Sequence, residues 1–234
     1  IAALEGTEGA LIFSSGMAAI SHMFLAFLQK GDHLVVQNTL YGGTLNFIKE
    51  EFPKYGIEYT FTNGYKAKDF EDVIQSNTKL IHIETPSNPL LTITDIRDVT
   101  QIAKSKGIVT SIDNTFASPI NQTPLDLGID LSIHSATKYL SGHSDISAGV
   151  VAGTKEHVDM IMHKGRNFGG NLSDFMCFLL ERSIKTLALR VEKHNHNAQY
   201  IADALSSIPV EAKLVRTLLE RSIPLPSSFE KAIR

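Results

Sequence analysis

Short apolar runs that are typical of buried strands alternate with helical patterns along most of this chain of 234 residues. We expect strands at residues 10–13, 33–37, 57–61, 79–83, 108–113 and 146–152, with a further strand within 132–140. We expect helices at residues 17–28, 41–52 (ended by Pro53), 68–75, 94–104 (closed by Gly107), 155–162 and 174–205. This alternation predicts an α/β fold in which helices flank a mostly parallel central sheet.

Composition and charge narrow the class of protein. With 43% hydrophobic and 20% charged residues, the chain can form one substantial core. Its formal net charge of −3 provides no basic face, so we expect no nucleic-acid partner and no binding to an anionic membrane. Cys177 is the single cysteine, which excludes an intrachain disulfide and favours a reducing, cytoplasmic location. No apolar run approaches the length of a membrane span.

The segment 132–140, S-I-H-S-A-T-K-Y-L, places a lysine after a buried strand pattern. A lysine in this position is costly unless its amine reacts, for example with an aldehyde to form a Schiff base. The hydroxyls of Ser135 and Thr137 are suited to bind a phosphate next to Lys138. Taken alone, the pattern is equally compatible with a strand end followed by a solvated lysine.

Two segments upstream of Lys138 favour the interpretation that its amine reacts with an aldehyde. Asp113 ends a buried strand, where open α/β sheets bind ligands, and an aspartate there can hold a ring nitrogen protonated. Gly16 lies where a strand turns into the helix that begins near Met17, so a phosphate could reach free backbone N–H groups. By itself this segment could be an ordinary strand-to-helix turn. Together with Lys138, the two segments supply the partners that pyridoxal 5′-phosphate (PLP) needs.

Six motifs in this order resemble the Cys/Met-metabolism family of PLP-dependent enzymes. They run from Ile1 to about Leu205 and read I-A-A-L-E-G, S-S-G-M-A-A-I, L-Y-G-G-T, E-T-P-S-N-P, I-D-N-T-F-A-S-P and H-S-A-T-K-Y-L-S-G-H-S-D. The resemblance implies the PLP-dependent transferase fold (fold type I), with its large domain at residues 1–205 and a tail of uncertain structure at 206–234. It also implies that the family's N-terminal arm and C-terminal domain are missing, together with the arginine that binds the substrate carboxylate. The chain is then a fragment, a partial structure or a degenerate relative.

The resemblance also assigns roles to single residues. Lys138 matches the lysine that bonds to PLP and later moves protons, and Asp113 matches the partner of the pyridinium nitrogen. Tyr41 is similar to the tyrosine that stacks on the cofactor ring and assists departure of the γ-substituent, and Asn88 to the side chain that binds the phenolic oxygen. The family's phosphate site corresponds to Gly16, Met17, Ser135 and Thr137. Without the family, Tyr41 would be interpreted as a core aromatic and Asn88 as a turn residue.

The activity implied is γ-replacement or γ-elimination on a small amino acid of the homoserine-ester or cystathionine type, as in cystathionine γ-synthase or γ-lyase. Gly43, where methionine γ-lyases typically have cysteine, and Ser144 in G-H-S-D favour the cystathionine enzymes. Methionine γ-lyase, cystathionine β-lyase and O-acetylhomoserine sulfhydrylase are the alternatives within the family. A PLP-binding fragment without turnover is the alternative of another class. The family further implies a homotetramer, a dimer of dimers with shared active sites.

The histidines do not predict a metal site. His194 and His196 are two residues apart within a helical pattern, and such residues do not share a helix face. His143, in G-H-S-D, is better suited to anchor the loop after Lys138.

Overall fold

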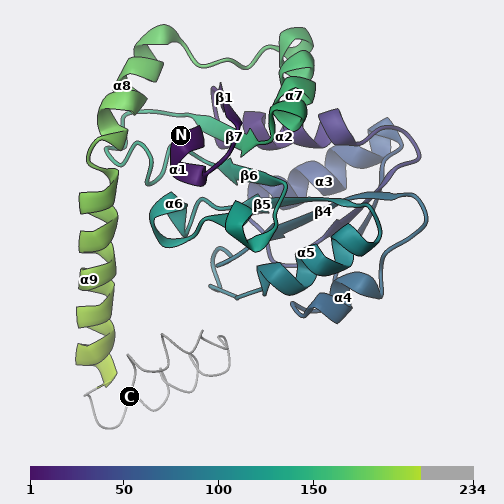
Figure 1. The fold of residues 1–234 in the computed structure, drawn as a ribbon, viewed down its shortest axis with the longest axis horizontal. Helices are drawn as coiled ribbons and strands as arrows, with labels where there is room; N and C mark the ends of the chain where they lie inside the picture. The colour runs from purple at the N-terminus through teal and green to yellow at the C-terminus, as the bar shows by residue number, and fades with distance from the viewer. Residues whose placement is uncertain (207–234) are drawn as a thin grey trace.

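The computed structural model describes residues 1–206, which form a twisted sheet between layers of helices (Figure 1). Within these residues the sheet has seven strands in the order β1-β7-β6-β5-β4-β2-β3. β7 pairs antiparallel with both of its neighbours, and the other pairs are parallel. The strands are β1 (Gly9–Phe13), β2 (His33–Val36), β3 (Glu58–Phe61), β4 (Thr78–Glu84), β5 (Val109–Asp113), β6 (Leu131–His134) and β7 (Gly149–Gly153). The expected mostly parallel α/β sheet is confirmed.

Helices cover both faces of this sheet because its central strands are apolar on both sides. On one face, Leu34 and Val36 of β2 pack with α2 (Gly16–Phe27), α3 (Gly42–Tyr55) and α7 (Lys155–Phe168). On the other face, Val35 packs with α4 (Ala67–Glu71) and α5 (Ile96–Ser105). The alternation of side chains along one strand therefore supplies two separate cores.

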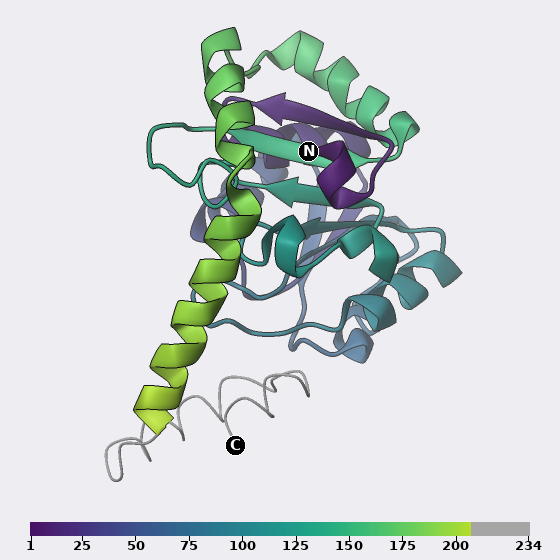
Figure 2. The ribbon, with the colours of Figure 1, turned by 60° about the vertical axis from the view of Figure 1, so that its left-hand side comes forward.

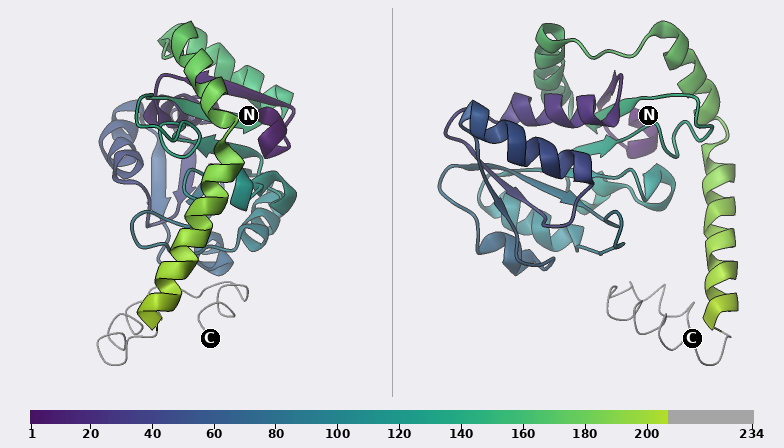
Figure 3. Two further views of the ribbon diagram at one scale, coloured as in Figure 1. Left: turned by 90° about the vertical axis from the view of Figure 1, so that its left-hand side faces the viewer. Right: turned by 180° about the vertical axis from the view of Figure 1, so that it is seen from behind.

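A third core lies against β7 and the first residues of the chain. α8 (Asp174–Ile184) and α9 (Leu187–Ser206) contribute apolar side chains to this core. Three short elements complete the fold: α1 (Ala2–Glu5), α6 (Ser118–Asn121) and the 3₁₀ turn η1 (Pro124–Leu127). α9 begins beside the loop that follows β6 and then extends past the sheet (Figures 2 and 3). No helix within residues 1–206 combines the length and the apolar character needed to cross a bilayer.

Pro53 does not end a helix, contrary to expectation. α3 continues to Tyr55 and is closed by Gly56, which has a left-handed conformation and donates its N–H to the Phe52 carbonyl. A proline this close to the end of a helix removes a single backbone hydrogen bond, so the last turn persists.

The single long helix expected at 174–205 is in fact two helices, α8 and α9, which separate at Lys185 and Thr186. The break is stabilised by side chains, since the Thr186 hydroxyl and the Arg190 guanidinium both donate to the Ser183 carbonyl. It allows both helices to bury apolar side chains in one core, Leu180 from α8 and Leu187 from α9. From residue 207 onward, the expected tail lies outside the described residues.

Candidate active site

The loops that follow the parallel strands meet at one edge of the sheet. Because β1, β2, β4, β5 and β6 run in the same direction, their carboxyl ends share this edge, and antiparallel β7 begins there. Open α/β sheets bind ligands at such an edge. Every residue that the sequence nominated for cofactor binding lies at this edge, on segments far apart in the chain: Gly16, Met17, Tyr41, Asn88, Asp113, Ser135, Thr137 and Lys138.

The start of α2 forms a cradle with the loop after β6. The Ser15 side chain caps α2 by accepting the Ala18 N–H at 3.1 Å. The N–H groups of Gly16 and Met17 make no hydrogen bond within the described part of the chain, and a helix start of this kind binds anions. A Cβ on Gly16 would lie 2.8 Å from Cβ of Ser135, so only glycine allows this close approach. The cradle has the donors that a phosphate needs.

The two hydroxyls expected at this cradle differ in their surroundings. The Ser135 hydroxyl makes no hydrogen bond to residues 1–206 and would lie 3.1 Å from a Cβ on Gly16. The Thr137 hydroxyl instead donates to the Ala148 carbonyl at 3.2 Å and accepts the Ala148 N–H at 3.0 Å. Thr137 therefore secures the lysine loop to the start of β7, and its contact with a phosphate stays a prediction.

Asp113 ends β5, and its side chain is buried with 7% exposure. Burial raises the pKa of this carboxyl, while the hydrogen bonds from Thr115 and the charge of a protonated His134 oppose the rise. Its Oδ1 accepts the Thr115 N–H at 3.0 Å. The Thr115 hydroxyl in turn accepts the Ser135 N–H at 2.7 Å. The turns that carry the acid and the lysine are therefore bonded to each other.

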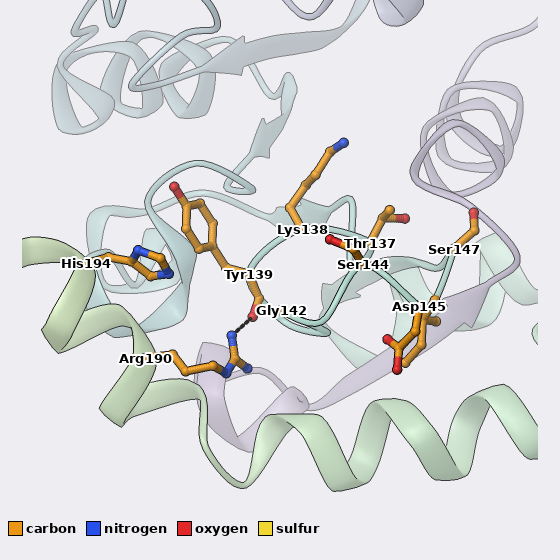
Figure 4. Close-up of a pocket in the computed structure, with 10 residues that line it drawn as sticks. Thr137, Lys138, Tyr139, Gly142, Ser144, Asp145, Ser147, Arg190 and His194 are labelled. Carbon is orange, nitrogen blue, oxygen red and sulfur yellow. Dashed lines mark hydrogen bonds between the residues drawn. The ribbon is translucent and has the colours of Figure 1, made fainter.

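Lys138 lies in the turn after β6, and its side chain is exposed. Its N–H donates to the Ser135 carbonyl, and its carbonyl accepts the Gly142 N–H. The turn borders a pocket of about 610 Å³ that also contains Arg190 and His194. Figure 4 shows Lys138 pointing away from Arg190, whose guanidinium donates to the Tyr139 carbonyl at 2.7 Å. The amine is thus free to react, and the described residues do not desolvate it.

The His143 ring nitrogen Nδ1 lies 2.6 Å from the Ser141 carbonyl. This contact agrees with the expected role of His143 in anchoring the loop after Lys138. His194, for which the sequence does not predict a metal site, packs its ring against Tyr139. The two ring centroids are 5.6 Å apart.

Tyr41 and Asn88 are exposed, and a residue that sequence reasoning missed connects them. Glu84, the last residue of β4, accepts the Tyr41 N–H through Oε2 and the Asn88 N–H through Oε1, both at 2.7 Å. The Tyr41 ring also packs over Gly43, where a Cβ would lie 2.5 Å from the ring. The one sequence signal for Glu84 is an acid at the end of an apolar strand, the same pattern that identified Asp113.

Glu84 faces Asp113 on the neighbouring strand, and the two residues are register partners. Burial raises the pKa of Glu84 to about 7, and repulsion from Asp113 adds to the rise, while the two backbone N–H groups oppose it. Two buried carboxyls this close do not ionise independently. A cation bound at Asp113 would therefore also favour the charged form of Glu84.

Glu5 is a second acidic residue that the sequence did not nominate, and it contacts the segments that carry the candidate site. Glu5, fully buried in α1, bonds to Nε2 of His134 and accepts an N–H from the Asn114 side chain at 3.1 Å. Burial disfavours the charged form of Glu5, but the hydrogen bond and charge of His134, together with the Asn114 contact, lower its pKa below the usual value. Glu5 thereby connects the N-terminal segment to the ends of β5 and β6.

These observations fit PLP. The free N–H groups at Gly16 and Met17 suit the phosphate, the buried carboxyl of Asp113 suits the ring N–H, and the exposed amine of Lys138 suits the aldehyde. The glycine-dependent contact between Gly16 and Ser135 shows that the cradle requires close backbone approach, as phosphate binding at a helix start does.

Comparison with known proteins gives one consistent result. The family model described as Cys/Met metabolism PLP-dependent enzyme matches residues 1–220. The chain is 47% identical over 210 residues to cystathionine beta-lyase MetC of Bacillus subtilis, a match that covers 89% of this chain and 54% of that relative. It is 42% identical over 216 residues to L-methionine gamma-lyase of Porphyromonas gingivalis, and this match covers 91% of this chain and 54% of that relative.

Solved structures agree. The crystal structure of metB from Corynebacterium glutamicum matches with a TM-score of 0.86 and 42% identity, covering 89% of this chain and 55% of that one. Cystathionine gamma-lyase from Lactobacillus plantarum, complexed with L-serine, matches with the same TM-score and coverage at 40% identity. The chain spans about half the length of the curated relatives it matches.

Proposed function

Since this chain belongs to the Cys/Met-metabolism family of PLP-dependent enzymes, we propose that Lys138 carries PLP and that the full-length protein acts on sulfur amino acids. The observation that carries the proposal is the meeting of three groups at one sheet edge. These are the free N–H groups at the start of α2, the buried carboxyl of Asp113 and the exposed amine of Lys138.

In this proposal the residues at the ends of β1, β5 and β6 would hold the cofactor. Gly16, Met17 and Ser135 hold its phosphate through N–H and hydroxyl donors. Asp113 holds the proton on the ring nitrogen through a charge-assisted hydrogen bond. Bound PLP supplies an electron sink that makes the substrate α-proton acidic. The amine of Lys138, which has no partner among the described residues, removes that proton and returns it.

Tyr41 and Asn88 complete the site. Asn88 would donate a hydrogen bond to the phenolic oxygen of the cofactor, and the Tyr41 ring would hold the cofactor ring by stacking. The Tyr41 hydroxyl then protonates the departing γ-substituent. Support for this placement comes from Glu84, which ties the backbone of both residues to the strand beside Asp113.

The proposed reactions are γ-replacement and γ-elimination. In replacement, cysteine displaces acetate or succinate from an O-acylhomoserine and forms cystathionine. In elimination, cystathionine and water give cysteine, an α-keto acid and ammonia. A cystathionine β-lyase is the second candidate, because the chain is 47% identical to a relative with that activity.

Borohydride trapping tests the cofactor assignment. The full-length protein loaded with PLP should be yellow, and reduction should leave a stable adduct that peptide mapping places on Lys138. Lys138→Ala should bind no cofactor covalently, whereas Lys155→Ala, at an exposed lysine of α7, should bind it normally. An adduct on Lys155 or Lys164 of the unaltered protein would overturn the assignment.

A substrate panel tests the activity. The full-length enzyme would be given O-acetyl- or O-succinylhomoserine with cysteine, then cystathionine, then methionine. Cystathionine formed from the ester or cleaved to cysteine supports the proposal. Cleavage of cystathionine only to homocysteine would show the β-lyase, and far faster turnover of methionine would show a methionine γ-lyase.

We also propose that residues 1–205 are the PLP-binding domain and that the full-length protein is a homotetramer with shared sites. Large apolar side chains exposed on α8 and α9 support an interface there: Phe175, Phe178, Leu189, Tyr200 and Ile201. Light scattering coupled to size exclusion would test this proposal, and a monomeric holoenzyme would refute it.

A further inference from the structure

We propose that Glu84 is a positioning residue whose carboxylate holds the turns of Tyr41 and Asn88 in place beside Asp113. The roles of Tyr41 and Asn88 rest on the proposed function, whereas the contacts of Glu84 do not. Glu84 acts through these two residues and does not itself touch a reacting atom.

The first support is the hydrogen-bond geometry. Oε2 of Glu84 accepts the Tyr41 N–H, and Oε1 accepts the Asn88 N–H, each at 2.7 Å. Charge-assisted hydrogen bonds of this length are stronger than those between neutral groups. Because each oxygen binds a different segment, one side chain joins the loop after β2 to the loop after β4.

The second support is that Glu84 is the acceptor for the N–H groups of Tyr41 and Asn88 themselves. The other hydrogen bonds of these loops are made by neighbouring residues, such as the Ser87 N–H to the Thr92 carbonyl and the Gln37 side chain to the Thr39 carbonyl. The Tyr41 side chain is 48% exposed and Asn88 is exposed, so packing does not fix them. Tyr41 precedes the first residue of α3 and makes no side-chain cap. The Glu84 carboxylate therefore acts at Tyr41 and Asn88 directly, in addition to the hydrogen bonds that hold the rest of each loop.

The third support is that Glu84 is itself held rigidly. Its carbonyl accepts a hydrogen bond at 2.8 Å from the side chain of Gln37, which is fully buried. The Gln37 oxygen in turn accepts the Thr94 hydroxyl at 2.9 Å. Buried networks in which every member is bonded are rigid, so the position of the Glu84 carboxylate is well determined.

The chemistry requires a carboxylate at this position. A glutamine has one carbonyl oxygen and one NH₂ group, so it can accept one of the two N–H groups and must face the other with a donor. An N–H left without an acceptor in a buried place is unfavourable. Glu84→Gln should therefore release one of the two turns while changing the side-chain volume very little.

A matched control is available at the opposite end of the sheet. Oδ2 of Asp130 accepts the Thr110 N–H at 2.8 Å and the Thr110 hydroxyl at 2.7 Å, at the start of β5. Asp130→Asn makes the same chemical change as Glu84→Gln, also at a carboxylate that accepts a backbone N–H. It lies away from the carboxyl edge that forms the candidate site.

The test is amide hydrogen exchange on the full-length protein without PLP, at a pH above 7 where Glu84 is ionised, followed by kinetics with PLP. We expect Glu84→Gln to speed exchange about 10-fold in the peptide around Tyr41 or the peptide around Asn88, because an unfavourable contact replaces a charged hydrogen bond. Asp130→Asn should leave both peptides unchanged. With PLP, Glu84→Gln should still form the Lys138 adduct but lose about 10-fold in kcat, since misplaced groups slow the chemical step.

Unchanged exchange in both peptides of a folded Glu84→Gln protein would overturn the inference. If that variant does not fold, Glu84→Asp keeps both acceptors but withdraws them by one methylene. It should loosen at least one turn, and normal protection of both turns would equally overturn the inference. Failure of the proposed function would be recognised separately, because the unaltered protein would then form no adduct on Lys138.

Discussion

Gly16→Ala tests the phosphate cradle through the close approach of the helix start to Ser135. The added methyl group would lie 2.8 Å from Cβ of Ser135 and 3.1 Å from both its Cα and its hydroxyl. Forcing an extra methyl into such a contact costs about 1–3 kcal/mol. Replacing glycine by alanine within a helix returns about 0.5–1 kcal/mol. The clash is the larger effect, so we expect a net loss of about 1 kcal/mol.

Gly42→Ala is the matched control, because Gly42 also begins a helix but a Cβ there meets nothing within 4 Å. Urea unfolding of the full-length protein without PLP would give the free energy of unfolding of both variants. Gly16→Ala should be less stable than the unaltered protein, and Gly42→Ala equally stable or more stable. PLP should bind more weakly to Gly16→Ala alone, since the displaced helix start no longer presents its N–H groups to the phosphate.

The reasoning would be refuted if the two alanine variants were equally stable and bound PLP equally well. In that case the loop of Ser135 would be free to move aside, and the cradle would not depend on glycine.

Three further changes have defined outcomes. The pKa of Glu84 is about 7 in the folded protein, above its usual value, and that of Asp113 is also raised. The contribution of Glu84 to stability is therefore fully present below about pH 4, its ordinary range, and is lost as the pH rises through about 7. Glu84→Gln should flatten that part of the plot of unfolding free energy against pH. Arg190→Ala removes guanidinium hydrogen bonds to three backbone carbonyls and should destabilise the protein by about 2 kcal/mol in urea unfolding. The same change at exposed Arg182 should have almost no effect. Asp113→Ala should lower turnover by about 10² in steady-state assays, and near-normal turnover would contradict its role.

The sequence by itself determined the fold class and nominated the chemical groups of the candidate site. Apolar runs gave the strands at the correct places, and a parallel sheet brings their carboxyl ends to one edge whatever the details of packing. Asp113 and Lys138 could be nominated because they occur together with the Gly16 turn and within the ordered motifs of the family, whereas either residue alone is equally compatible with a solvated strand end. Their place at one edge follows from strand direction alone.

The local interruptions could not be read from the sequence. Pro53 predicts the end of a helix, but a proline disturbs the turn before it, through its missing N–H and its contact with the carbonyl four residues earlier, so the backbone remains helical to Tyr55. No proline or glycine near Lys185 and Thr186 predicts the break between α8 and α9. It arises because Arg190 and Thr186 bond the Ser183 carbonyl, while Leu187 joins the core already occupied by α8.

Only the tertiary structure decided how the site is held together. Glu84 lies 43 residues from Tyr41, and Glu5 lies 129 residues from His134, so neither pairing has a local signature. The partners of Glu84 are backbone N–H groups. Every residue except proline carries such a group, so the sequence cannot predict which of them Glu84 binds. A carboxylate at the end of a strand is equally compatible with solvent. The folded sheet buries the Glu84 carboxylate beside Asp113, and in that position it accepts hydrogen bonds from two loops.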